Sequence, residues 1–149
     1  MKHYIAMALL INALTACEST AVKAPISAAK NVHALPAQTL SSGECGLFFW
    51  TKTTPQNFVF FHKQNQTHAK YFVHGDETSL RLTRGALIPN MSADLDIQYT
   101  APQGKTFHLK GTYSQSIEGG VRVQNGSITA QDNEGWQEIV PVSGIFACQ

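Results

Sequence analysis

The chain of 149 residues lacks a hydrophobic run long enough to cross a bilayer as a helix. Its most apolar stretch, residues 4–16, follows a short charged start and is well below the roughly 20 residues that a spanning helix needs. A stretch of this length is typical of the hydrophobic region of a secretory signal. We therefore expect residues 1–16 to be an export signal and not a membrane span.

The sequence also lacks an excess of charge of either sign. It holds 11 basic and 10 acidic side chains, and loss of residues 1–16 would remove Lys2 alone, which leaves 10 of each. No basic stripe and no basic aromatic cluster occurs along the chain. Nucleic acid is therefore not an expected partner.

Motifs of the common enzyme classes are missing. The chain has no Cys-x-x-Cys pair, no Gly-x-Ser-x-Gly elbow and no glycine-rich loop before a predicted helix. Asp94 and Asp96 alternate along one predicted strand, roughly 6.6 Å apart by the strand rise, a spacing compatible with a glycosidase carboxylate pair. A solvated strand face has the same pattern, so we expect no catalytic residue and no cofactor. An envelope hydrolase that uses these two carboxylates is the alternative.

Three evenly spaced histidines raise the question of a metal site. His62 and His68 could face each other across a predicted hairpin, but His74 lies about 20 Å further along the same strand. Three such side chains cannot reach one ion whose bonds are near 2 Å. The spacing therefore predicts no metal site, and it favours histidines that face solvent.

At the end of the apolar stretch the sequence reads Leu14-Thr15-Ala16-Cys17. These four residues resemble the lipobox of bacterial lipoproteins. The resemblance implies transfer of a diacylglyceryl group to the Cys17 thiol, cleavage after Ala16, and acylation of the new N-terminus. Two or three acyl chains hold a protein firmly at a bilayer, whereas one does so only marginally. The membrane is therefore an expected partner, through a lipid on Cys17.

The residue after the anchor bears on location. In lipoproteins of bacteria with two membranes, an Asp directly after the acylated Cys typically retains the protein in the inner membrane. Here that residue is Glu18. The resemblance therefore implies the outer membrane, on its periplasmic side.

Cysteine is scarce, and the count is informative. Besides Cys17 the chain has only Cys45 and Cys148. Export implies an oxidising compartment in which disulfides persist. With Cys17 acylated, the two remaining thiols are expected to pair.

Residues 17–42 are rich in Ala, Ser, Thr and Pro and contain few large apolar groups. Such a segment buries too little surface to offset the entropy of ordering it. We interpret it as a lipidated flexible tether.

From residue 43 to residue 149 the chain reads as a β domain. Apolar and polar residues alternate with a period of two, as in Leu95-Asp96-Ile97 and Phe107-His108-Leu109, and turn-forming residues separate the runs. About eight strands without a helical pattern predict an antiparallel barrel or sandwich. In this fold Cys45 lies on the first strand and Cys148 on the last.

One hairpin is predicted in register. Asn125-Gly126 is the favoured dipeptide for a two-residue turn. Pairing Gln124 with Ser127 would then place Val123 opposite Ile128, with apolar pairs on one face.

Aromatic residues crowd the first three predicted strands and occur on both faces. One face must line the core, and the other is either covered or exposed. If exposed together, Trp50, Phe61 and Phe72 would form a patch typical of a partner-binding site.

The general plan, a small lipid-anchored antiparallel barrel with Cys at both ends, is similar to the membrane-bound inhibitors of C-type lysozyme. Those inhibitors have a Ser-Gly-x-x-Tyr-like segment and a segment that bears Lys-Gly, and neither occurs here in the right order. The similarity therefore covers architecture and not activity. We expect a non-enzymatic envelope lipoprotein that binds, inhibits or supports the assembly of an envelope protein partner.

Overall fold

The structure of the chain is a computed structural model, and it describes residues 33–88 and 94–149. The predicted export signal, Cys17, Glu18 and most of the predicted tether lie outside the described residues. No helix in the described part of the chain could span a membrane.

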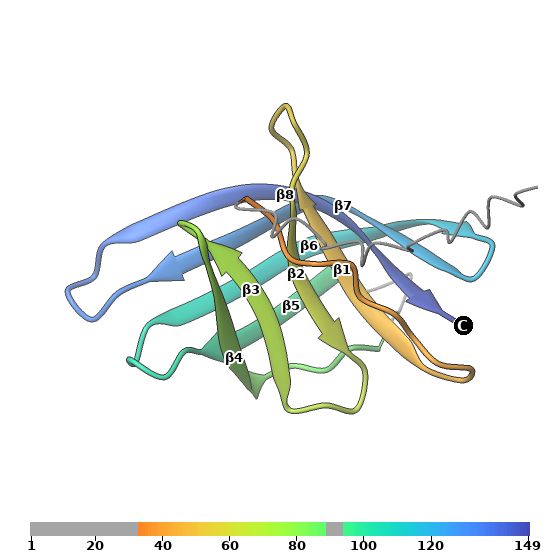
Figure 1. Cartoon of the computed structure of the whole chain (residues 1–149), viewed down its shortest axis with the longest axis horizontal. Coiled ribbons are helices and arrows are strands. Elements are labelled where there is room, and N and C mark those ends of the chain that lie inside the picture. Colours follow the sequence, from red (N-terminus) through yellow and green to blue (C-terminus); the bar gives the residue numbers. More distant parts are fainter. Residues whose placement is uncertain (1–32, 89–93) are drawn as a thin grey trace, which may run out of the picture.

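Eight antiparallel strands form a closed barrel in which each strand pairs with its neighbours in sequence and β8 pairs with β1 (Figure 1). The strands are β1 (Cys45–Thr51), β2 (Phe58–Lys63), β3 (His68–Val73), β4 (Asp76–Arg84), β5 (Asp94–Thr100), β6 (Thr106–Ile117), β7 (Gly120–Gln131) and β8 (Gln137–Cys148). The predicted all-β fold of about eight strands is confirmed. Of the two predicted architectures, a barrel and a sandwich, the structure has the barrel.

Period-two alternation explains how the barrel is filled. In β5, Leu95, Ile97 and Tyr99 are buried inside, whereas Asp94 and Asp96 are exposed outside. The interior of an eight-stranded barrel is just wide enough to be filled by side chains or to hold one small ligand. Large buried side chains fill most of it here, among them Phe49 and Phe60.

The first and last strands close the barrel, and a disulfide joins them. Cys45 and Cys148 are directly opposite each other in the β1–β8 pair, with Cα atoms 4.0 Å apart, and form the predicted disulfide. The bond links residues 103 positions apart, so it ties the two ends of the β domain together.

The hairpin predicted at Asn125-Gly126 is wrong. Both residues lie inside the continuous strand β7, where Asn125 has a φ of 50° and the register shifts against both β6 and β8. The dipeptide therefore forms a β-bulge that bends a long strand, and not a turn. Ile128 pairs with Leu109 and Val140 on neighbouring strands instead of with Val123.

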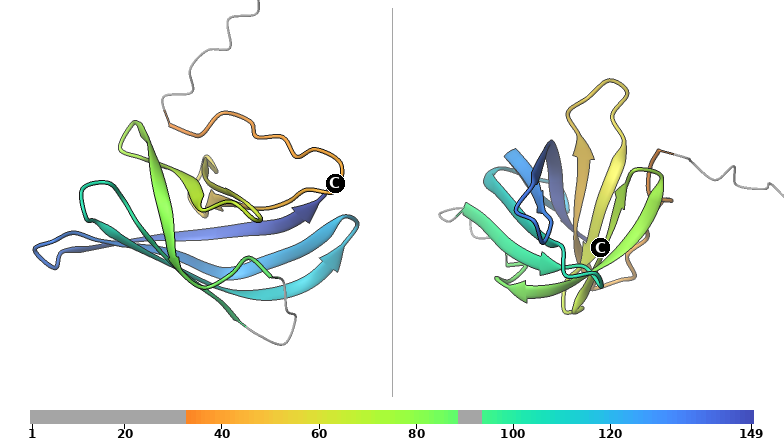
Figure 2. Two further views of the ribbon diagram at one scale, coloured as in Figure 1. Left: turned by 90° about the horizontal axis from the view of Figure 1, so that it is seen from below. Right: turned by 90° about the vertical axis from the view of Figure 1, so that its left-hand side faces the viewer.

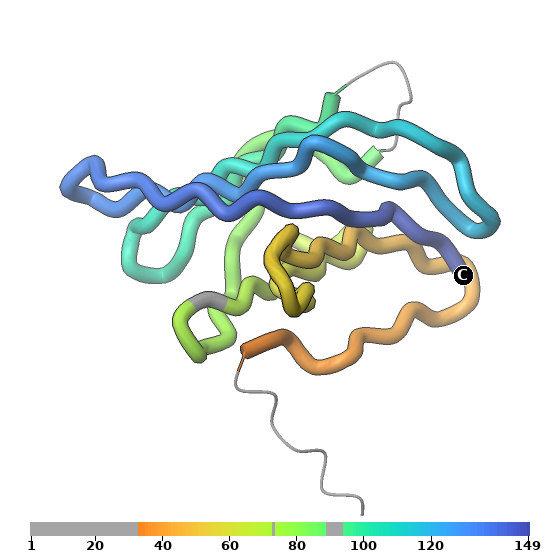
Figure 3. The backbone as a smooth tube through the Cα atoms, turned by 90° about the horizontal axis from the view of Figure 1, so that it is seen from above, coloured from red at the N-terminus to blue at the C-terminus, as the bar shows by residue number. Residues whose placement is uncertain are grey.

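The described end of the predicted tether is not free of the barrel. Residues 33–42, here called the strap, run along the outside of the barrel from beside the β3–β4 turn to the chain's C-terminus (Figures 2 and 3). Leu35 in the strap is only 2% exposed, because it packs on Phe61 and Phe72. The composition predicted a flexible segment, but Leu35 and Leu40 pack on an aromatic surface and hold residues 33–42 against the barrel.

Candidate functional site

The barrel has two different ends. At one end, here called the mouth, lie the loops 52–57, 74–75, 101–105 and 132–136. At the other, here called the closed end, lie the disulfide and the β2–β3 and β6–β7 turns.

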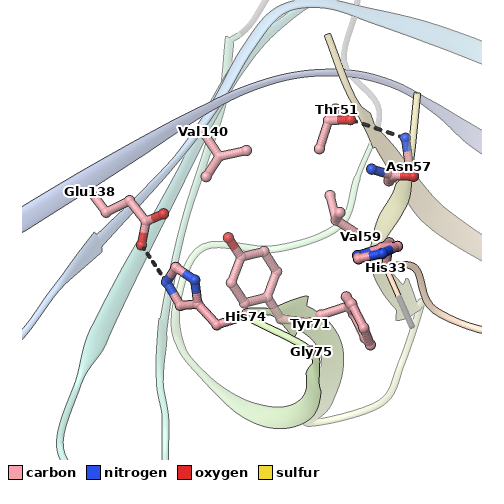
Figure 4. A pocket seen from close by; sticks show the side chains of 10 residues that line it. His33, Thr51, Asn57, Val59, Tyr71, His74, Gly75, Glu138 and Val140 are labelled. Carbon is pink, nitrogen blue, oxygen red and sulfur yellow. Dashed lines mark hydrogen bonds and ion pairs between the residues drawn. The ribbon is translucent and has the colours of Figure 1, made fainter. Parts of the chain in front are cut away.

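A cavity of about 560 Å³ opens at the mouth (Figure 4). This volume falls within the usual range for small-molecule sites, roughly 300 to 1,000 Å³. Strands β1, β2, β3 and β8, the β3–β4 turn and the strap all contribute to it. Its lining residues are His33, Thr51, Asn57, Val59, Tyr71, Phe72, His74, Gly75, Glu138 and Val140.

The cavity exists because β2 and β3 separate toward the mouth. Their register comprises Phe60 opposite Tyr71 and Phe61 opposite Lys70, at the middle of both strands. If this register continued, Phe58 would pair with the last residue of β3. Instead, the carbonyl of Phe58 accepts a hydrogen bond of 2.7 Å from the backbone N–H of Leu35. The strap thus occupies the edge of β2 that β3 leaves free, and the barrel wall opens beside it.

The cavity wall is mainly apolar. Val59 and Val140 lie on opposite sides, and the ring of Tyr71 forms the surface between them, with its hydroxyl directed into the space (Figure 4). Tyr71 is 2% exposed, and this burial, followed by the nearby charge of Glu138, raises the pKa of its hydroxyl to about 12. Tyr71 is therefore a neutral hydrogen-bonding group at any physiological pH.

The other hydroxyl in the lining has partners in the β1–β2 loop. Thr51 Oγ1 accepts a hydrogen bond of 3.0 Å from the backbone N–H of Asn57 and lies 2.8 Å from Thr53 Oγ1. These contacts hold the loop in place at the mouth. They also occupy the hydroxyl, which has no adjacent histidine or carboxylate among its described contacts to activate it as a nucleophile.

A carboxylate–imidazole pair spans the rim of the cavity. Glu138 Oε2 on β8 lies 3.2 Å from His74 Nε2 on the β3–β4 turn, although β8 is not a neighbour of β3 or β4 in the sheet. The turn can present His74 in this direction because His74 and Gly75 both have positive φ, 50° and 95°. Both side chains remain largely accessible to solvent.

The three evenly spaced histidines lie in different environments. His68 and His74 are exposed, as expected, but His62 is 0% exposed, so the expectation of a solvent-facing residue is wrong for it. His62 Nε2 donates to the carbonyl of Gln66 at 2.8 Å, and Nδ1 accepts from the Tyr99 hydroxyl at 2.7 Å. Burial is the main cause that lowers the pKa of His62, which holds it in the neutral form. Both ring nitrogens of His62 therefore have partners inside the protein.

The carboxylates of the enzymatic alternative lie on the outer face of β5, outside the cavity. Asp94 and Asp96 are both exposed, and Asp96 Oδ1 lies 2.8 Å from His108 Nε2. That contact is the main cause that lowers the pKa of Asp96, whereas a general acid needs a raised one. Within the part of the chain that the structure describes, no group of three His, Cys, Asp or Glu side chains could hold a metal ion.

The strap covers the predicted aromatic patch. Phe61 and Phe72 are 6% and 8% exposed beneath Leu35, and only Trp50 of the three candidate residues stays partly accessible. Trp50 stacks on Phe48 and lies at a tilt against Phe58, at the edge of this cluster. The outer face of β1–β3 is therefore mostly the underside of the strap and not an open partner surface.

Sequence reasoning missed a well-exposed aromatic residue at the tip of the β7–β8 hairpin, which extends past the mouth (Figure 2). Trp136 is 76% exposed. Asp132 Oδ1 accepts hydrogen bonds from the backbone N–H groups of Glu134 and Trp136, at 3.0 and 2.9 Å, so the loop that presents the indole is ordered. The signal was the turn sequence Asp132-Asn133-Glu134-Gly135 directly before the tryptophan.

No protein-family model matches this chain, and neither a curated protein nor a solved structure matches it. Its candidate chemistry therefore rests on its own residues and geometry.

Proposed function

We propose that this protein is a lipid-anchored envelope lipoprotein whose barrel acts as a non-enzymatic binding module, with the mouth cavity as its binding site. The observation that carries the proposal is the cavity itself. Its wall is mainly apolar, it holds a neutral tyrosine hydroxyl, and the hydroxyl of Thr51 is already bonded. Such a lining binds and orients a molecule but offers no activated nucleophile.

The position of the cavity relative to the lipid anchor supports this proposal. The strap starts at His33, which is itself part of the cavity lining. The 16 residues that follow Cys17 up to His33 can reach at most about 55 Å when extended. An acyl anchor on Cys17 would therefore be connected to the barrel at the mouth, through the start of the strap.

Replacement of the anchor residue tests the lipoprotein half of the proposal. Cys17→Ser should leave an unprocessed precursor and abolish incorporation of labelled fatty acid. Continued labelling of this variant would contradict a lipid on Cys17. Membrane fractionation then tests location: the wild-type protein should band with outer-membrane markers, and Glu18→Asp should shift part of it to the inner membrane.

Photo-crosslinking in living cells tests the binding half. A benzophenone amino acid at position 140 would lie in the cavity, whereas the same group at position 139 would lie on the opposite face of β8, where Ile139 is 62% exposed. We expect a mass adduct on the protein with the label at position 140 and none with the label at 139. Equal labelling at both positions, or none at 140, would contradict binding at the mouth.

A further inference from the structure

We infer that the ligand of the mouth cavity is a small amphiphile with an apolar body and a polar end that donates hydrogen bonds, as an alcohol or an ammonium group does. This inference rests on the proposed binding function and narrows it to a ligand class. It follows from the separation of apolar and polar groups within the cavity.

The apolar body has a defined place. Val59 on β2 and Val140 on β8 face each other across the space, with Tyr71 on β3 between them (Figure 4). Phe72 adds a second aromatic ring where β2 and β3 separate. Burial of an apolar group here is favourable, because it removes apolar surface from water.

The polar end of the ligand would meet an acceptor at the rim. The described contact of the Glu138 carboxylate with His74 uses Oε2, so Oε1 can accept from a ligand. Glu138 belongs to the cavity lining together with Tyr71, and its charge is the lesser of the two causes that raise the pKa of the Tyr71 hydroxyl. A donor group on the ligand is therefore favoured at this position.

A carboxylate-bearing ligand fits poorly by the same reasoning. Among the described residues that line the cavity, none is Lys or Arg. A carboxylate at the rim would face Glu138, and two like charges at short distance repel each other. The position beside Glu138 therefore favours a polar end that is neutral or positively charged over one that is negatively charged.

Three probes of equal chain length separate these cases: hexan-1-ol, hexylammonium and hexanoate. Each is titrated into the full-length protein in lipid nanodiscs, with valine methyl groups observed by NMR. We expect saturable shifts at Val59 and Val140 with hexan-1-ol and hexylammonium, and at least tenfold weaker binding of hexanoate. Val123, 1% exposed near the closed end, serves as the internal control that should not shift.

Charge removal at the rim completes the test. Glu138→Gln removes the charge and keeps an oxygen that can accept, so it should reduce the preference for hexylammonium over hexanoate about tenfold. The matched control Glu134→Gln, on the same hairpin but outside the lining, should keep the preference.

The outcomes separate the two proposals. Hexanoate binding as tightly as hexylammonium, or an unchanged preference in Glu138→Gln, would overturn the ligand class while the binding site stands. No shift at Val59 and Val140 with any probe would overturn the binding site itself.

Discussion

At the closed end of the barrel, His62 is fully buried and both of its ring nitrogens have partners, whereas at the mouth the Tyr71 hydroxyl points into an open cavity. His62 on β2 and Tyr71 on β3 both face the interior of the barrel, and they are 9 positions apart in the sequence. The difference follows from the strands around them. Gln66 in the β2–β3 turn and Tyr99 on β5 are hydrogen-bond partners of His62, while at the mouth β2 and β3 separate and leave space.

The contrast indicates a division of roles within one barrel. Polar groups inside a protein stabilise it only when their hydrogen bonds are satisfied, and a fully satisfied group specifies one arrangement. The His62 ring fits this description, since its two buried hydrogen bonds join β2, β5 and the β2–β3 turn. The mouth keeps groups with spare hydrogen-bonding capacity, which is what a binding site needs.

Removal of the disulfide at the closed end should lower the free energy of unfolding more than any other change considered below. A loop of this length contributes up to about 4.7 kcal/mol in the chain-entropy model. We expect the double variant Cys45→Ala with Cys148→Ala to lose about 4 kcal/mol of unfolding free energy, measured by urea denaturation. The reduced wild-type protein should show a similar loss. A loss below about 1 kcal/mol would mean that the closed end does not depend on the bond.

Removal of the strap's main contact should rank second. Leu35→Ala deletes a side chain that is 2% exposed, and such truncations cost about 2 to 5 kcal/mol in cores. Because Leu35 packs on the outer face of the barrel and not in its core, we expect a loss near the lower figure, about 2 kcal/mol. Leu40→Ala, at a half-buried position of the same strap, should cost less. Equal losses in the two variants would contradict a strap fixed mainly at Leu35.

A matched pair of tyrosine variants compares the two ends directly. Tyr99→Phe leaves His62 Nδ1 buried without its donor, which should cost about 1 to 3 kcal/mol. Tyr71→Phe removes a hydroxyl that faces the cavity, and the expected loss is within about 0.5 kcal/mol. Urea denaturation of both variants measures the difference. If Tyr71→Phe were as costly as Tyr99→Phe, the mouth would be as tightly bonded as the closed end.

The smallest expected effect is the loss of stability at acid pH that His62 causes. The pKa of His62 is lowered from 6.5 in the folded protein, so below pH 6.5 the unfolded chain binds a proton that the folded protein does not. Stability should therefore fall as the pH drops below 6.5, by at most about 1.4 kcal/mol per pH unit from this group. His62→Gln, whose amide can donate to Gln66 and accept from Tyr99, should flatten this slope between pH 6.5 and 5.

The control for that measurement is His108→Gln on the outer face of β6, which should leave the contribution of His62 intact. The lowered pKa values of Asp96 and Glu44 act only below pH 4.5, outside the measured window. An unchanged slope in His62→Gln would show that another group causes the acid sensitivity.

The strands and the disulfide were predictable, because each follows from a local or countable feature. Alternation along β5 and β6 determines which side chains point inward, and the strand ends coincide with Gly and Pro residues. The β-bulge at Asn125-Gly126 was not predictable in this way. The dipeptide tolerates a positive φ both in a turn and in a bulge, and only pairing of β7 with both β6 and β8 decides between them.

By itself, the sequence determined the class of fold, the inward-facing residues of β5 and β6, and the pairing of Cys45 with Cys148, since all three depend on residue types and their spacing. Only the tertiary structure decided that the barrel is closed, that the strap covers Phe61 and Phe72, and that a cavity opens where β2 and β3 separate. The physical reason is that each of these features joins segments far apart in the chain. Glu138 meets His74 across 64 positions, and no local pattern encodes that distance.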